Sequence, residues 1–315
     1  MRYGTRTRRY VVSLAAMSLI LAACATEAGD ESTTSEGATS TTAASTTTGS
    51  AETSTTTVPS TTTTATETSG FVVYFMLEEL DVDDGTPGPY LVPVFREAPE
   101  SGIEAETVMT LLLEGPNSGE TSGVPPISTA IPDGTSLLGV TVESGLATVD
   151  LSGEYDDGGG SFGMFARLAQ VVYTLTRLPD VEEVAFSVDG TPVTTFSSEG
   201  IELDGPQSRE DYYDLLPPVF VDSPAWGQPV TSPVSVFGLS NVFEAVSQVM
   251  LTDDDGLPLF EDHVMATCGT GCWGEWSVDI TYDVDREQFG ALIVWEISAK
   301  DGSQVNVREY PVMLG

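Results

Sequence analysis

The chain has 315 residues, of which 48 are acidic and 11 are basic, and its formal net charge is −37 at pH 7. A surface this acidic repels nucleic-acid phosphates and anionic lipid headgroups, so the composition argues against both as partners. Solubility or adaptation to salt explains the charge without any ligand, and the single lysine, Lys300, agrees with the latter. The length suffices for one large domain or two ordinary ones.

The first 24 residues have the pattern of an export signal. An arginine-rich segment precedes an apolar run that ends at Leu21-Ala22-Ala23-Cys24, and this run is too short to span a membrane. Small residues ahead of a cysteine resemble the lipobox of bacterial lipoproteins, which implies that residues 1–23 are a signal peptide and that Cys24 is lipidated. The alternative is an ordinary secretory signal in which Cys24 is incidental. The export route, Sec or twin-arginine, stays open.

Lipidation at Cys24 would hold the protein at the outer face of the cytoplasmic membrane. Each buried methylene of an acyl chain contributes about 0.8 kcal/mol, so two or three chains make a permanent anchor. Cleavage would remove four of the 11 basic residues and none of the 48 acidic ones, which leaves a net charge of −41. Residues 24–69 are mostly Thr, Ser, Ala and Glu, and they predict a disordered stalk because so few apolar side chains cannot offset the entropy of ordering.

Predicted strands alternate with two helices over residues 70–204. Apolar or alternating runs predict strands at residues 71–77, 90–95, 137–142, 146–151 and 184–188. Apolar residues three or four positions apart predict helices over residues 105–112 and 161–178. In the second helix the shared apolar face is expected to hold Phe165, Leu168, Ala169, Val172 and Leu175. This alternation predicts a compact α/β-type layer, with one sheet and the helices on one side of it.

Five segments within residues 71–196 form a recognisable series: residues 91–96, 111–116, 131–135, 149–152, and 170–174 followed by 184–190. In this order they resemble the sporulation and spore germination (GerMN) domain. Each segment is common by itself, and their order carries the resemblance. It implies a small α+β domain like the ring-building motifs of envelope assemblies, and a family without a known catalytic site.

A polar and acidic segment at residues 205–216 separates this part from a second one that contains strands only. Strands are predicted at residues 230–237, 245–251, 256–267, 276–282, 291–298 and 305–313. Six or seven short strands in about 100 residues predict a β-sandwich over residues 217–315. Residues 223–224, 232–234, 243–245 and 300–303 resemble the immunoglobulin-like domain of bacterial spore germination, which often follows the GerMN domain.

Cys268 and Cys272 flank Gly-Thr-Gly and are the cysteines that remain besides Cys24. With Cys24 lipidated, an exported chain keeps an even number of thiols, which favours a disulfide. The glycines let the loop bend until the two Cα atoms lie about 5.5–6 Å apart. A metal site would need His263, the only histidine, and has no apparent fourth ligand. We therefore predict a disulfide and neither a metal nor a cofactor.

Three other patterns have both a chemical and a structural interpretation. Residues 159–163 match G-x-S-x-G around Ser161, but the histidine lies about 100 residues away, so a glycine loop with Ser161 as helix N-cap is favoured. Asp253-Asp254-Asp255-Gly256 lacks the leading carboxylate of a calcium loop and predicts a hairpin turn. Among four tryptophans that could stack on carbohydrate, Trp273 is the best candidate for an exposed contact.

These expectations describe a non-enzymatic lipoprotein that binds or assembles with an envelope protein or a cell-wall glycan. The main alternative is an enzyme that modifies wall polymers with a pair of carboxylates. Such an enzyme needs facing carboxylates in a cleft, one of them with a raised pKa. A solute-binding receptor would need a deep pocket between domains, against which the small size of each domain argues.

Overall fold

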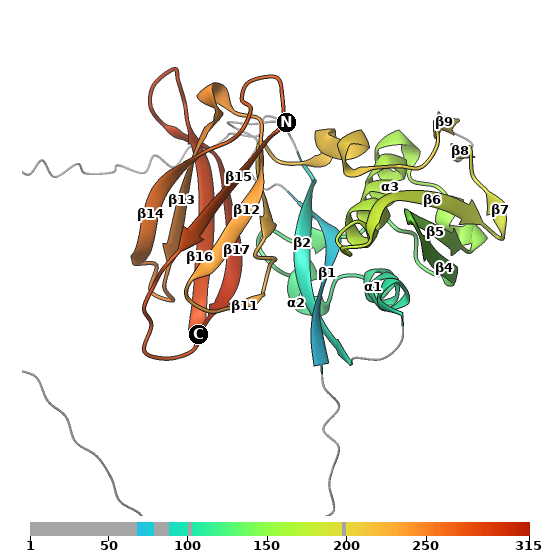
Figure 1. Cartoon of the computed structure of the whole chain (residues 1–315), viewed down its shortest axis with the longest axis horizontal. Helices are drawn as coiled ribbons and strands as arrows, with labels where there is room; N and C mark the ends of the chain where they lie inside the picture. Colours follow the sequence, from blue (N-terminus) through green and yellow to red (C-terminus); the bar gives the residue numbers. More distant parts are fainter. Residues whose placement is uncertain (1–67, 79–87, 100–102, 197–199) are drawn as a thin grey trace, which may run out of the picture. The chain divides into compact units, whose positions relative to one another are not determined.

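The computed structural model describes residues 68–78, 88–99, 103–196 and 200–315 (Figure 1). Cys24, the signal peptide and nearly all of the predicted stalk lie outside the described residues. Within the described ranges, no helix is long and apolar enough to cross a membrane.

The first sheet is antiparallel and is built on the longest apolar run of the chain's first folded part. Its order is β2 (Tyr90–Pro99), β1 (Thr68–Leu77) and β3 (Ile127–Ser128). β1 and β2 pair over their whole length, from Thr68 opposite Pro99 to Leu77 opposite Tyr90. Residues 73–76 are each at most 1% exposed, so both faces of β1 are covered, as expected for a strand without apolar–polar alternation.

A second sheet has the order β4 (Leu137–Glu143), β5 (Gly145–Leu151), β6 (Val181–Val188) and β7 (Thr191–Pro192). β4 and β5 form the predicted hairpin, and β5 pairs in parallel with β6 through a crossover that contains α3 (Gly160–Leu175). The helix α1 (Glu104–Leu113) packs on α3, on β1 and on β4. Short elements complete this part: α2 (Ser118–Thr121), η1 (Gly153–Asp156), β8 (Thr195–Phe196) and β9 (Ile201–Glu202).

The prediction of one sheet is wrong, and α3 provides the physical reason. β1 continues past the end of the two-residue strand β3, which pairs only with Met76 and Leu77. The backbone of Tyr74 therefore has no strand partner on that side among the described pairings. Instead, Nε2 of Gln170 donates to the carbonyl oxygen of Tyr74 at 3.0 Å. The backbone N–H of Tyr74 donates to Oγ1 of Thr174, also at 3.0 Å. Two helix side chains thus replace a neighbouring strand, and the sheet ends there.

The helix α3 is buried on more than one face. Leu168, Ala169, Val172 and Leu175 are fully buried as predicted, but Phe165 is 43% exposed. Both sheets contact α3 (Figure 1). A helix that packs on two sheets is apolar on more than one side. The predicted single apolar face therefore covers only part of the buried surface of α3.

The acidic segment expected to connect the two folded parts is itself packed. It contains η2 (Arg209–Leu215), in which Tyr212 and Leu215 are buried. The hydroxyl of Tyr173 on α3 donates to the carbonyl oxygen of Arg209 at 3.2 Å. This segment therefore belongs to the core around α3.

The remaining chain forms two facing sheets, which confirms the predicted sandwich. One sheet has the order β10 (Val219–Ser223), β12 (Val234–Ser240) and β15 (Gly274–Ile280). The other has the order β11 (Pro229–Val230), β17 (Gln304–Leu314), β16 (Gln288–Ile297), β13 (Val246–Thr252) and β14 (Pro258–Met265), and η3 (Phe243–Ala245) precedes β13. Inward residues such as Val236, Trp276 and Leu292 are at most 3% exposed and form the core between the sheets. The predicted fold class, an α+β part followed by an all-β sandwich, is confirmed.

Because several tyrosines are buried, we expect the protein to lose stability at alkaline pH. Burial raises the pKa of Tyr310 to about 12, and it also raises the pKa values of Tyr74, Tyr155 and Tyr173. The unfolded chain loses these protons near pH 10 while the folded chain keeps them, so rising pH favours unfolding. We expect the tyrosine contribution to the free energy of unfolding to be complete below about pH 10 and to fall above it. Titration of these phenols near their ordinary pKa with an unchanged circular dichroism spectrum would contradict this expectation.

Candidate functional site

Asp222 on β10 lies at the centre of a buried polar cluster and is 7% exposed. Its Oδ2 accepts hydrogen bonds from Nη1 of Arg177 at 2.8 Å and from Nη1 of Arg209 at 3.0 Å. Its Oδ1 accepts a hydrogen bond from the hydroxyl of Tyr74 at 2.5 Å. The donors come from β1, from the segment after α3 and from η2, so the carboxylate joins the sandwich to three separate parts of the α+β region.

The guanidinium of Arg209 makes the most contacts in this cluster. Its Nε donates to Oγ1 of Thr176 at 2.8 Å, and its Nη2 donates to the hydroxyl of Tyr74 and the carbonyl of Tyr173, both at 3.2 Å. It also lies 4.7 Å from the ring centroid of Tyr173. Burial alone would lower the pKa of Arg209, but Tyr74 and Asp222 raise it by more, so the guanidinium stays charged. Two guanidinium charges therefore face one carboxylate.

A pocket of about 640 Å³ lies beside the cluster. Its lining includes Arg209 and Tyr213 from η2 together with Asp222, and residues of β12, β14 and β15 and Thr267 complete it. Phe237 on β12 is 39% exposed, and the guanidinium carbon of Arg177 lies 5.3 Å from its ring centroid. The pocket therefore joins charged groups to exposed apolar surface, and its volume falls in the range typical of small-molecule sites.

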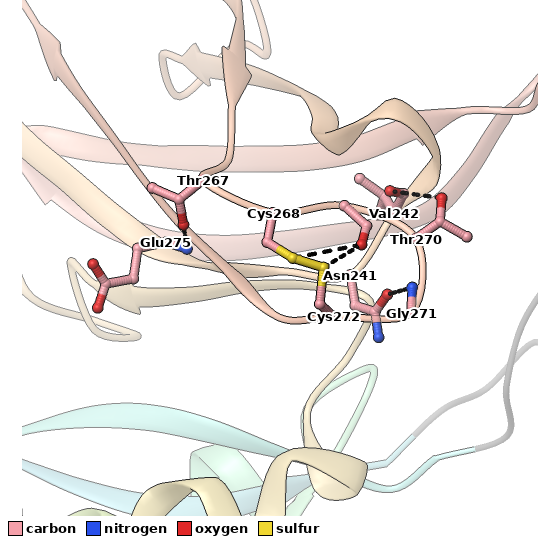
Figure 2. The surroundings of a disulfide bond; sticks show 9 residues. Asn241, Val242, Thr267, Cys268, Thr270, Gly271, Cys272 and Glu275 are labelled. Atoms are coloured by element: carbon pink, nitrogen blue, oxygen red, sulfur yellow. Dashed lines mark hydrogen bonds between the residues drawn. A yellow bond between two sulfur atoms is a disulfide. The ribbon is translucent and has the colours of Figure 1, made fainter.

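The disulfide loop connects β14 to β15 at one edge of this pocket (Figure 2). Cys268 and Cys272 are bonded through their sulfur atoms, with their Cα atoms 5.9 Å apart, within the expected range. The N–H of Gly271 donates to Oδ1 of Asn241 at 2.8 Å, and that of Thr270 donates to the carbonyl oxygen of Val242 at 2.9 Å. Figure 2 shows Thr267 and Glu275 at the two ends of the loop, and both line the pocket. The loop thus fixes part of the pocket's edge.

Replacing both Cys268 and Cys272 by serine is expected to lower the free energy of unfolding by about 2 kcal/mol, because so short a loop restricts the unfolded chain only modestly. Urea denaturation of the oxidised protein and of the double variant measures the difference. Mass spectrometry without reductant should find no free thiol at either position. Two alkylated thiols in the native protein would contradict the disulfide.

The tryptophans occupy different surroundings. Trp276 and Trp295 are buried at 3% and 4% exposure, in agreement with a core role. Trp273 is half-buried, and its ring centroid lies 5.6 Å from that of Tyr213 on η2. Packing against η2 thus takes the place of the exposed contact that was predicted for Trp273.

The other sequence candidates have structural roles. The N-cap of α3 is Gly159 with a φ of 102°, so the prediction of Ser161 as N-cap is wrong, and Ser161 lies in the first turn. Oδ1 of Asp253 accepts from the N–H groups of Asp255 at 3.0 Å and Leu257 at 2.8 Å, which confirms the hairpin turn. His263 is exposed on β14, with its Nδ1 3.1 Å from Oδ1 of Asp262.

Two observations on the described part of the chain concern metal binding and acid–base chemistry. No group of three or more His, Cys, Asp or Glu residues there could hold a metal ion. The pKa values of Glu154 and Asp301 are both lowered, mainly by hydrogen bonds from Ser152 and Ser303. A general acid needs the opposite shift.

The arrangement defines a chain of two modules, an α+β module with a buried central helix and a β-sandwich. Residues 72–194 match the family described as sporulation and spore germination, and residues 218–303 match the immunoglobulin-like domain of bacterial spore germination. The chain therefore carries these two domains in this order, as the resemblance predicted. Neither description names an enzymatic activity.

Three solved structures are similar to the chain at low identity. The tandem GerMN domains of the sporulation protein GerM from Bacillus subtilis match with 16% identity and a TM-score of 0.39, over 68% of this chain and 62% of that one. A putative lipoprotein from Clostridium perfringens matches with 19% identity and a TM-score of 0.31, over 47% of this chain and 93% of that one. The first GerMN domain of GerM matches with 16% identity and a TM-score of 0.34, over 45% of this chain and 99% of that one. No curated protein matches the chain at a significant level.

Proposed function

We propose that the protein is a non-enzymatic lipoprotein, anchored through Cys24 at the outer face of the cytoplasmic membrane, that presents two binding modules for a sporulation-, germination- or wall-related process. The observation that carries the proposal is the order of the chain: Leu21-Ala22-Ala23-Cys24, a hydroxyl-rich segment, then the two matched domains. The partner is an envelope protein or a cell-wall glycan.

The charge of the chain supports a covalent anchor. A mature net charge of −41 repels anionic headgroups, so these modules would not stay near the membrane by surface attraction. β1 begins at Thr68, two residues before the predicted end of the stalk; as a flexible coil, residues 24–67 would span about 40 Å, well beyond a Debye length of about 10 Å. The anchor retains the modules, and the spacer keeps them where the repulsion is screened.

Metabolic labelling with a fatty-acid analogue tests the anchor. We expect the label on the wild-type protein, with a mature amino terminus at Cys24, and no label on Cys24→Ala because no other residue can accept the diacylglyceryl thioether there. The double variant Cys268→Ser, Cys272→Ser is the matched control and should keep the label. An unlabelled wild-type protein released into the medium would refute the proposal.

A further inference from the structure

We propose that the pocket formed by η2, β10, β12 and β15 binds an uncharged, hydroxyl-rich ligand of one or two sugar rings. The inference rests on the proposed function, which exposes this pocket to the envelope. The pocket's volume of about 640 Å³ accommodates a ligand of this size.

The charges around the pocket sum to zero and therefore favour an uncharged ligand. Arg209, Asp222 and Glu275 line it, and Arg177, which is outside the lining, pairs with Asp222 and lies against the ring of Phe237. The two guanidinium groups disfavour a cation. A polyanion would have to approach a mature chain with a net charge of −41. An uncharged ligand is repelled neither by the two guanidinium groups nor by the acidic chain.

The polar groups of the site match hydroxyl groups. Tyr213 on η2 lines the pocket and supplies a phenolic hydroxyl, which can both donate and accept. Glu275 and Ser277 lie on the exposed face of β15 and add a carboxylate acceptor and a hydroxyl. A sugar hydroxyl also donates and accepts, so one ligand can pair with these two hydroxyls and with the carboxylate.

Exposed apolar side chains supply a surface for the C–H face of a sugar ring. Phe237 lies on the outward face of β12, where the strand alternation places it, and is 39% exposed; Met265 at the pocket is 70% exposed. The contact with Arg177 holds the Phe237 ring in place. A fixed aromatic ring beside polar groups that converge on one pocket is the usual composition of a small-ligand site.

Calorimetric titration of the full-length protein in detergent micelles tests the proposal with three uncharged disaccharide probes: chitobiose, cellobiose and maltose. Polyglutamate and trilysine serve as charged probes. We expect at least one uncharged probe to bind and the charged probes not to bind. Phe237→Ala should weaken binding at least tenfold, and Glu275→Gln, an isosteric change at an exposed position, about threefold or more. Phe289→Ala is the matched control because Phe289 is 67% exposed on β16 and does not line the pocket.

Circular dichroism of each variant separates loss of binding from loss of folding, and Glu275→Gln carries the test if Phe237→Ala unfolds. Failure of all three uncharged probes to bind, equal binding by Glu275→Gln and wild type, or a preference for a charged probe would each overturn the proposal. None of these results would change fatty-acid labelling of Cys24, so the anchor and the sugar site can fail separately.

Discussion

Replacing Asp222 by asparagine is expected to lower the free energy of unfolding by about 3–5 kcal/mol. The carboxylate is the shared acceptor of Arg177 and Arg209, with side-chain exposures of 24% and 23%, and it also accepts from the Tyr74 hydroxyl. An amide would leave two partly buried guanidinium groups facing each other without a counter-charge. Urea denaturation followed by circular dichroism measures the loss.

Asp254→Asn is the matched control for this substitution. Asp254 pairs with Arg286 at 2.8 Å, the same distance as in the Asp222–Arg177 pair, but Arg286 is 62% exposed and solvent screens the interaction. We expect the control to leave stability unchanged within error. Equal, small effects of the two variants would show that the Asp222 cluster contributes no more than a surface ion pair.

The Asp222 variant should also loosen the segment between the two modules. Arg209 belongs to η2, whose position depends on Asp222, on Tyr173 and on the contact between Tyr213 and Trp273. Limited proteolysis is therefore expected to cut the variant within residues 205–216 before it cuts either module. Cleavage of wild type and variant at the same rate would contradict this role of Asp222.

The elements that could be predicted from the sequence are those whose formation depends on residues close together in the chain. The unbroken apolar run of β1, the hairpin of β4 and β5 and the alternation in β15 all reflect burial on one or two faces of a strand, which neighbouring residues alone reveal. The disulfide loop was predictable for the same reason, because cysteine spacing and glycines within five residues determine whether two sulfur atoms can meet.

The polar cluster could not be predicted because its partners are far apart in the chain. Asp222 lies 148 residues from Tyr74 and 45 from Arg177, and no local period relates them. The composition nevertheless indicated that Asp222 and the arginines would be paired. Outside the signal peptide the chain has seven basic residues, so each arginine is scarce, and an aspartate that directly follows Val219-Phe220-Val221 requires a partner. The same reasoning applies to Gln170 and Thr174, which are polar residues on a buried helix that bond to the backbone of β1.

The contacts of Arg167 give a structural explanation for the G-x-S-x-G motif around Ser161. The glycines before Ser161 form a loop in which Gly158, Gly159 and Gly160 all have positive φ values, of 56°, 102° and 62°. A Cβ atom at Gly159 would lie 2.4 Å from Nη2 of Arg167. Gly159 is therefore needed because the loop passes close to a buried guanidinium, whereas a Cβ atom at Gly158 or Gly160 would meet nothing within 4 Å and their positive φ values alone favour glycine.

Replacing Arg167 by methionine is expected to lower the free energy of unfolding by about 3–5 kcal/mol. Arg167 is 2% exposed, and its Nη1 donates to the carbonyls of Tyr155 at 2.5 Å and Asp157 at 3.0 Å, while Nη2 donates to the carbonyl of Gly158 at 3.0 Å. Methionine fills much of the same volume but leaves three carbonyl groups without these donors. Arg167→Lys should recover part of the loss, because an ammonium group keeps the charge without reaching all three acceptors.

Arg286→Met is the control for removing an exposed arginine, and we expect it to leave stability unchanged within error. Urea denaturation gives the stability of all three variants, and hydrogen exchange of the Gly158–Gly160 amides reports on the loop itself. Exchange should accelerate in Arg167→Met at denaturant concentrations where the rest of the protein stays folded, because the loop loses its donors before the core opens. A stable Arg167→Met protein with unchanged exchange would mean that water satisfies these carbonyls as well as the guanidinium does, and that Gly159 serves some other purpose.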